Sequence, residues 1–120
     1  MQIYGYPGDR VDFVSKSGSA GSIVFGDSAD LVEEFFGPAH TKEAEVYTYF
    51  NGSIALGFDA GKVRDIIITP QASREKIEVF LGKEKLNGLS PDKLETLTQG
   101  TSSSVVLGAD KEIETVTFAG

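Results

Sequence analysis

Ser28 is the residue whose surroundings come nearest to a catalytic motif. It follows Gly26 and Asp27, after the apolar run at 22–25, where a strand is expected to turn into a helix. A serine in such a turn can act as a nucleophile when a neighbouring base takes its proton. The chain contains one histidine, His40, which is preceded by Gly37, Pro38 and Ala39 rather than by an acidic residue. The residues needed to activate Ser28 are therefore missing from the sequence.

The Gly26-Asp27-Ser28 order resembles the first block of the Gly-Asp-Ser serine hydrolases. That resemblance implies an Asp-x-x-His motif near the C-terminus, and the sequence has none. His40 alone cannot build a metal site or a proton relay, and we interpret it as a loop residue. The absence of cysteine excludes thiolate nucleophiles and cysteine-based zinc sites. We assign no catalytic, cofactor-binding or metal-binding residue, and we expect a protein that is not an enzyme.

Length and composition are typical of one globular domain spanning residues 1–120. Forty per cent of the residues are hydrophobic, which is enough to form a core. No apolar stretch reaches the roughly 18 residues that a membrane-spanning helix needs. The first residues, MQIYGYPGDR, lack the basic and hydrophobic regions of a signal peptide. We therefore expect a cytoplasmic protein.

The net charge of −7 narrows the class of partner. It argues against nucleic acids and anionic membranes, which both attract lysine and arginine. Residues 1–61 carry nine acidic and three basic side chains, so the N-terminal half is the more acidic part. This half could attract a partner protein with a basic surface. A solvated acidic surface that only promotes solubility is the alternative interpretation.

Hydrophobic periodicity predicts short strands and two short helices. Residues 11–15 and 22–25 read as a hairpin, and the apolar spacing at 29–36 predicts a helix that Gly37 ends. Asn51-Gly52 predicts a type I′ turn inside a second hairpin at 46–58. Counting outward from this turn pairs Tyr49 with Ile54 and Tyr47 with Leu56. Further strands are expected at 63–69, 76–81, 104–108 and 113–118, and the second helix follows Ser90.

An internal repeat supports a structural role for Ser28. FGDSADLVEEF at 25–35 aligns with NGLSPDKLETL at 87–97, so Ser28 corresponds to Ser90. Pro91 follows Ser90, and proline favours the first helical position, so Ser90 is expected to be the N-cap. By analogy, Ser28 caps its own helix by accepting a hydrogen bond from a backbone N–H.

The repeat predicts the fold as well. We place pseudo-repeat 1 at about 11–69 and pseudo-repeat 2 at about 76–120, within the single domain. The expected fold class is α+β, an antiparallel sheet with two short helices packed on one face, in a tandem strand-helix-strand-strand repeat. The second copy lacks a counterpart of VYTYFNG at 46–52, so we expect it to contribute one strand fewer.

The repeated unit resembles that of the beta-lactamase inhibitory protein. It is also similar to the small outer-membrane assembly lipoproteins that share the same helix-plus-sheet unit. The residues that carry the resemblance are Gly26, Ser28, Val32, Phe35, Gly37 and Pro38 on the helix, and Tyr47, Tyr49, Gly52, Leu56, Phe58, Asp59, Gly61, Val63 and Ile66 on the strands. The resemblance implies a sheet whose open face grips another protein. A cytoplasmic, acidic protein of this size is also typical of bacterial immunity proteins, which neutralise a toxin by binding it.

Our first hypothesis is therefore a protein-binding domain of the immunity or inhibitor type. We expect its sheet face to contact the partner, while Tyr47 and Tyr49 pack in the core. The binding residues that we predict are Glu43, Glu45, Thr48, Phe50, Ile67, Thr115 and Thr117. A second hypothesis is a homodimer or assembly module joined through an edge strand at 76–81 or 113–118. A third is small-ligand binding in a pocket between the helices and the sheet.

Overall fold

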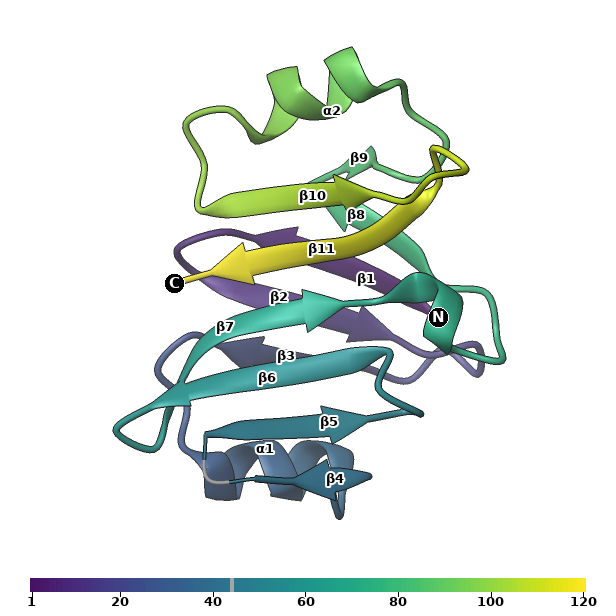
Figure 1. Cartoon of the computed structure of the whole chain (residues 1–120). Coiled ribbons are helices and arrows are strands. Elements are labelled where there is room, and N and C mark those ends of the chain that lie inside the picture. Colours follow the sequence, from purple (N-terminus) through teal and green to yellow (C-terminus); the bar gives the residue numbers. More distant parts are fainter. Residues whose placement is uncertain (44) are drawn as a thin grey trace.

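The strands form two sheets that enclose one core. The computed structural model describes residues 1–43 and 45–120. Figure 1 shows a five-stranded sheet, in the order β3-β2-β1-β8-β9, behind a six-stranded sheet, in the order β10-β11-β7-β6-β5-β4. The five-stranded sheet contains β1 (Gln2–Tyr6), β2 (Arg10–Val14), β3 (Ala20–Val24), β8 (Glu78–Leu81) and β9 (Glu84–Lys85). The six-stranded sheet contains β4 (Thr41–Lys42), β5 (Val46–Tyr49), β6 (Ile54–Asp59), β7 (Lys62–Ile68), β10 (Ser103–Leu107) and β11 (Ile113–Ala119).

The core lies between the two sheets because each strand alternates apolar and polar residues. Ile3 and Val11 are completely buried on the five-stranded sheet, and Leu56 and Phe118 are completely buried on the six-stranded sheet. Gly5 of β1 allows the two sheets to approach closely. A Cβ atom at Gly5 would lie 2.2 Å from a ring carbon of Phe118, so any larger residue there would displace that ring.

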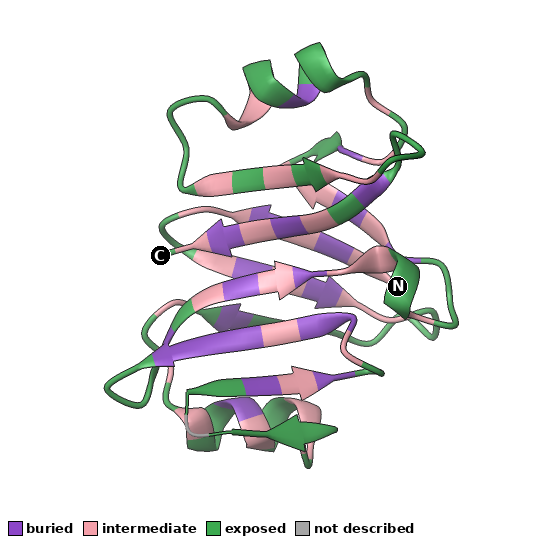
Figure 2. Ribbon diagram, viewed as in Figure 1, coloured by how far each residue is buried: buried purple, intermediate pink, exposed green. Residues whose placement is uncertain are grey.

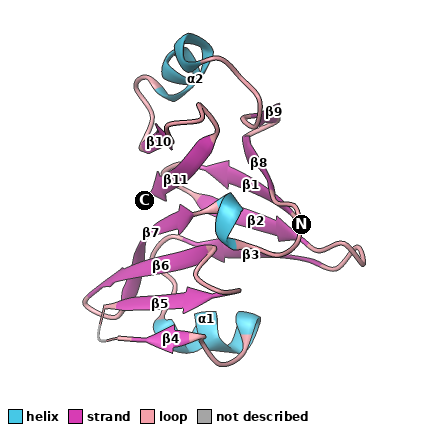
Figure 3. Ribbon diagram, turned by 45° about the vertical axis from the view of Figure 1, so that its right-hand side comes forward, coloured by secondary structure: helices cyan, strands magenta, loops and turns pink. Residues whose placement is uncertain are grey.

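Two helices of eight residues lie at opposite ends of the six-stranded sheet (Figure 3). Helix α1 (Ala29–Phe36) lies near β4 and β5, and helix α2 (Pro91–Thr98) lies beyond β10. The predicted caps are confirmed. Ser28 Oγ accepts a hydrogen bond from Leu31 N at 3.2 Å, and Ser90 Oγ accepts one from Lys93 N at 3.3 Å. Both serines have extended backbone angles, as an N-cap requires.

The α+β class is confirmed, while the arrangement of its layers differs from our expectation. We predicted one antiparallel sheet with both helices on one face, and the strands instead form two sheets. The difference arises from β1, because the sequence analysis predicted no strand at residues 2–6. It pairs with β2 in antiparallel fashion and with β8 in parallel fashion. It thereby joins two hairpins that are distant in sequence into a second sheet.

The two strands proposed as edges for dimerisation are both inside their sheets. Strand β8, in the segment 76–81, lies between β1 and β9, and β11, in the segment 113–118, lies between β10 and β7. The prediction that these segments offer free edges is therefore wrong. The strands that end the two sheets are β3, β9, β10 and β4. Among the described residues, neither helix has the length and apolar composition needed to cross a membrane.

Candidate protein-binding face

Among the described residues, no helix crosses the outer face of the six-stranded sheet. Figures 1 and 3 show α1 and α2 at its two ends, and neither crosses it. One row of residues in direct cross-strand register runs over all six strands. We call this row the open face, and from β10 to β4 it consists of Ser104, Thr117, Ile67, Ala55, Thr48 and Thr41.

The strand alternation explains why these residues point outward. Thr48, Ile67 and Thr117 each lie between two buried neighbours in sequence, and successive side chains of a strand point to opposite faces. Figure 2 shows the result as buried and less buried residues alternating along β11, β7 and β5. Three of the seven predicted binding residues are thus brought into a single row.

The open face combines short hydroxyl side chains with a few apolar ones. Thr41 and Thr48 hydrogen-bond to each other through their hydroxyl groups across β4 and β5. Ile67 is half-buried near the middle of the row, and Val106 and Val46 remain 51% and 40% exposed on the same face. Thr115 is half-buried opposite Val106, two positions along β11 from the row. Mixed apolar and polar composition of this kind is typical of protein interfaces that form and dissociate.

Asp65 belongs to the same face and was missed by the sequence analysis. It pairs with Gly57 on β6, and a Cβ atom at Gly57 would lie 2.2 Å from Asp65 Oδ1. The Asp65 carboxylate therefore lies over Gly57 of the neighbouring strand, and its Oδ2 accepts a hydrogen bond from Arg64 Nε at 3.3 Å. Oδ1 is buried without a hydrogen-bond partner among the described residues. The register of β6 and β7 could have predicted this position of Asp65, because it places Gly57 directly opposite the acidic side chain.

Glu43 and Glu45 lie at the β4–β5 end of this sheet, and both side chains are exposed. Their backbones are held in place, since Glu43 N donates to Val46 O at 3.0 Å and Glu45 O accepts from Phe58 N at 2.8 Å. The nearby Lys42 is already paired, with Nζ 2.7 Å from Glu33 Oε1. That hydrogen bond raises the pKa of Lys42. Among the described residues, neither glutamate forms an ion pair, so both place exposed negative charge beside the open face.

Phe50 does not lie on this face, contrary to our prediction. Its backbone has a φ of 51°, and Asn51 follows with 58°, so the positive angles begin one residue earlier than expected. Gly52 N donates to Tyr49 O, which closes a turn around Phe50 and Asn51. The strand pairing of Tyr49 with Ile54 and of Tyr47 with Leu56 is nevertheless as predicted. Phe50 leaves the sheet at the turn and remains 47% exposed.

Phe50 instead joins an aromatic cluster around α1. Its ring lies 5.8 Å from the ring of Phe36, and Phe36 also contacts Tyr49 and Phe13 at 4.7 and 5.1 Å. Tyr49 is 2% exposed and Tyr47 is 8% exposed, which confirms that both tyrosines are core residues. The predicted apolar face of α1 is only partly buried. Val32 is completely buried, whereas Leu31 and Phe35 are 50% and 40% exposed.

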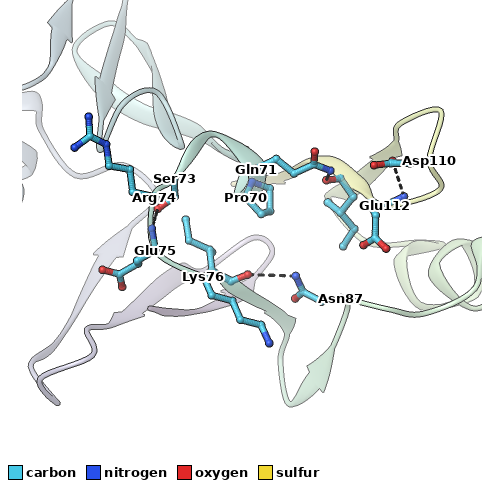
Figure 4. Close-up of a pocket in the computed structure, with 11 residues that line it drawn as sticks. Pro70, Gln71, Ser73, Arg74, Glu75, Lys76, Asn87, Asp110 and Glu112 are labelled. Atoms are coloured by element: carbon cyan, nitrogen blue, oxygen red, sulfur yellow. Dashed lines mark hydrogen bonds between the residues drawn. The ribbon is translucent and has the colours of Figure 1, made fainter.

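A separate cavity lies at the crossover from β7 to β8, where a short 3₁₀ helix (Pro70–Ala72) leads out of the six-stranded sheet. Its volume is about 600 Å³. The amide of Gln71 donates to Ile113 O, and the amide of Asn87 binds the backbones of Ile77 and Val79. Figure 4 shows Arg74 and Glu75 pointing away from Asp110 and Glu112 across the cavity. The Gln71 and Asn87 amides thus tie connecting segments to neighbouring backbone, and the charged side chains do not converge on a common point.

The catalytic candidates from the sequence are dispersed in the structure. Ser28 Oγ serves as a helix cap, and within the part of the chain that the structure describes its hydrogen-bond partner is Leu31 N. His40 is exposed in the loop before β4, where its backbone N donates to Thr48 O at 2.7 Å. Within residues 1–43 and 45–120, no three histidine or acidic side chains cluster closely enough to hold a metal ion.

Comparison with known proteins returned no match among protein-family models, curated proteins or solved structures.

Proposed function

We propose that this protein is a non-catalytic protein-binding domain, and that the open face contacts its partner. The observation that carries the proposal is the continuous row from Ser104 to Thr41. It crosses six strands in register, and no helix covers it. A face of short side chains around Ile67 can pack closely against another protein surface, because no long side chain of the row has to be immobilised first.

The charge around the open face defines the partner's chemistry. Glu43 and Glu45 are exposed at one end of the row, and Asp65 lies beside it. With a net charge of −7 for the whole chain, a partner with a basic surface would be attracted over a long range and oriented towards this end. Nucleic acid and anionic membranes, which are themselves acidic, are disfavoured for the same reason.

The more specific form of the proposal is an immunity or inhibitor protein that neutralises a toxin. It is supported by the sequence repeat and by its resemblance to the inhibitory-protein unit. Ser28 and Ser90 cap helices of equal length, as that repeat requires. The proposal includes a cytoplasmic setting, where an immunity protein would meet a toxin made in the same cell.

The test is binding to the products of the genes that adjoin the gene for this chain. We expect one adjacent product to form a stable complex with the purified full-length protein. Ile67→Asp places a charge in the middle of the open face and should weaken that complex at least about tenfold. Val24→Asp is the matched control, because Val24 is an exposed apolar strand residue of the other sheet. It should leave binding unchanged.

Two results would contradict the proposal. If no adjacent product binds, the immunity function is rejected. If a complex forms that Val24→Asp disrupts and Ile67→Asp does not, the open face is not the contact surface. Light scattering on the isolated protein completes the experiment, because a dimer that persists on dilution would instead support the structural role as a homo-oligomer.

A further inference from the structure

The outer face of the five-stranded sheet carries aromatic side chains, unlike the open face. Tyr4 and Tyr6 of β1 are half-buried and alternate with two buried residues, Ile3 and Gly5. Phe80 of β8 is half-buried and follows a buried valine. Successive side chains of a strand point to opposite faces of the sheet, so these three rings point away from the core. This face therefore presents aromatic surface to a ligand.

Each tyrosine ring on this face has one side covered by another side chain. Tyr4 stacks on Phe80, with the ring centroids 4.5 Å apart and the ring planes inclined by 22°. The guanidinium carbon of Arg10 lies 4.4 Å from the centre of the Tyr6 ring. The hydroxyl of Tyr4 also donates to Gln2 Oε1 at 3.0 Å. Both rings are thus held in position before a ligand binds, which lowers the entropy cost of binding.

A cavity of about 580 Å³ lies beside the two tyrosines. Volumes of roughly 300–1,000 Å³ are typical of small-molecule sites. Residues of β1, β2 and β3 line the cavity, together with Lys83 from the turn between β8 and β9. Phe80 covers the side of Tyr4 towards β8 and does not line the cavity. The other side of the Tyr4 ring therefore borders the cavity, towards β2.

Asp12 of β2 supplies a fixed hydrogen-bond acceptor in this cavity. It lies directly opposite Tyr4 in the register of β1 and β2. Its Oδ1 accepts hydrogen bonds from Arg10 Nε at 3.0 Å and from Ser22 Oγ at 2.6 Å. These are the hydrogen bonds of the Asp12 side chain within the described residues, so Oδ2 remains available as an acceptor. The Asp12 side chain is 26% exposed, which leaves it accessible to a ligand.

The charges around the cavity balance, so they favour a neutral ligand over an ion. Arg10 lies between two carboxylates, since its second ion pair joins it to Asp9 at 2.8 Å. Lys83 adds the second positive charge. The Asp12 carboxylate only accepts hydrogen bonds and the Lys83 ammonium only donates them, so a ligand that binds both needs donors and acceptors. A hydroxyl group is both, and an apolar ring face can pack on Tyr4.

We propose that this cavity binds a neutral saccharide. One sugar ring places its C–H face against the Tyr4 ring, one hydroxyl donates to Asp12 Oδ2, and another accepts from Lys83 Nζ. A nucleotide could stack on the same ring, but Arg10, which would have to bind its phosphate, is already paired with two carboxylates. The site goes beyond the proposed function and does not depend on the open face, which belongs to the other sheet.

The experiment titrates the full-length ¹⁵N-labelled protein with four neutral hexasaccharides: cellohexaose, xylohexaose, maltohexaose and chitohexaose. We expect at least one of them to shift the amide resonances of Tyr4, Asp12 and Ser22 and to reach saturation, with a Kd of about 1 mM or less. Adenosine and AMP are titrated in parallel and should not shift these resonances.

Matched lysine variants test the polar contact. Lys83→Ala should weaken binding of the responding saccharide about threefold or more. Lys85→Ala is the control, because Lys85 follows the same turn but pairs with Glu78 and does not line the cavity. It should leave binding unchanged. Ile67→Asp should also leave binding unchanged, which separates this site from the open face.

Two further variants test the acceptor and the ring. Asp12→Asn keeps the shape of the side chain and replaces an acceptor oxygen with an NH₂ donor, so it should weaken binding at least about tenfold. Tyr4→Leu keeps an apolar cover on Phe80 and removes the flat ring, and it should have an effect of similar size. A retained native NMR spectrum shows that each variant is folded.

The proposal is overturned if no hexasaccharide shifts the three amides at about 10 mM, or if adenosine or AMP binds there more tightly than every hexasaccharide. It is also overturned if Lys85→Ala weakens binding as much as Lys83→Ala does. Folded Asp12→Asn and Tyr4→Leu proteins that bind the saccharide as tightly as the unchanged protein would have the same consequence.

Discussion

The two ends of the six-stranded sheet differ in how they are completed. Beyond β7, the sheet continues through β6, β5 and β4, and α1 packs its Phe36 against Tyr49. Beyond β11, the sheet stops at β10, and α2 lies beside that strand with a groove between them. The connection after each helix explains the difference. Residues 37–53 are long enough to form two strands, whereas residues 99–102 lead directly from α2 into β10.

A capped helix and the strand that follows it do not by themselves complete a sheet. Both helices begin at a serine cap and both have eight residues. Only the connection after α1, residues 37–53, adds a strand with two tyrosines beside β6. These are Tyr47 and Tyr49 of β5, which are at most 8% exposed. At the other end, among the described residues, no strand pairs with the outer edge of β10, and α2 lies beside it instead.

Hydrogen exchange in the free protein should reveal this difference most strongly. The amides of Ile54 and Leu56 bond β5, so they exchange only when that part of the sheet opens. The amides of Ser103 and Val105 point away from β11, and no described strand pairs with them. We expect the former pair to exchange at least about 100-fold more slowly, as measured by NMR at neutral pH. Similar rates for the two pairs would mean that the β10 edge is already closed.

Removing one strand leucine at each end should have unequal effects on stability. Leu56 is completely buried, and Leu56→Ala should lower the free energy of unfolding by about 2–5 kcal/mol. Leu107 is only partly buried beside the groove, so Leu107→Ala should cost less than half as much. Urea denaturation monitored by tyrosine fluorescence measures both values. Equal losses would show that β10 is packed as tightly as β6.

The two helix caps should contribute equally, unlike the two leucines. Ser28→Ala and Ser90→Ala each remove one hydrogen bond to an N-terminal backbone N–H. Each should lower the free energy of unfolding by about 1 kcal/mol. Replacing each serine with aspartate, another good cap, is the control and should restore most of the loss. A Ser28→Ala protein that kept its stability and lost activity on an ester would contradict the assignment of Ser28 as a helix cap.

The smallest effect concerns the ionisation of Tyr49 at the completed end. Burial raises the pKa of Tyr49, and the nearby carboxylate of Glu33 adds to the rise. The unfolded chain then loses this proton at lower pH than the folded chain does, so folding stability falls as the pH rises above about 10. Tyr49→Phe should flatten that part of the stability profile, measured by denaturation between pH 8 and 11. An identical slope in both proteins would contradict this assignment.

Local features of the fold followed from the sequence because neighbouring residues decide them. Pro91 identified Ser90 as a cap, and the repeat extended that prediction to Ser28. The Asn51-Gly52 pair located the hairpin and its register, although the turn began at Phe50. That shift of one residue moved Phe50 from the sheet face to the aromatic cluster. The open face was predicted in part, because alternation placed Thr48, Ile67 and Thr117 outward from their buried neighbours.

The sequence by itself determined the helix caps, the hairpins and the alternation of strands, since each depends on residues a few positions apart. Only the tertiary structure decided that β1 joins two distant hairpins into a second sheet, and that β5 pairs with β6 at one end whereas no described strand pairs with the outer edge of β10. These outcomes depend on which strand edges meet across long sequence separations. The backbone groups that pair there are the same in every residue except proline, so side-chain patterns alone do not specify the partner.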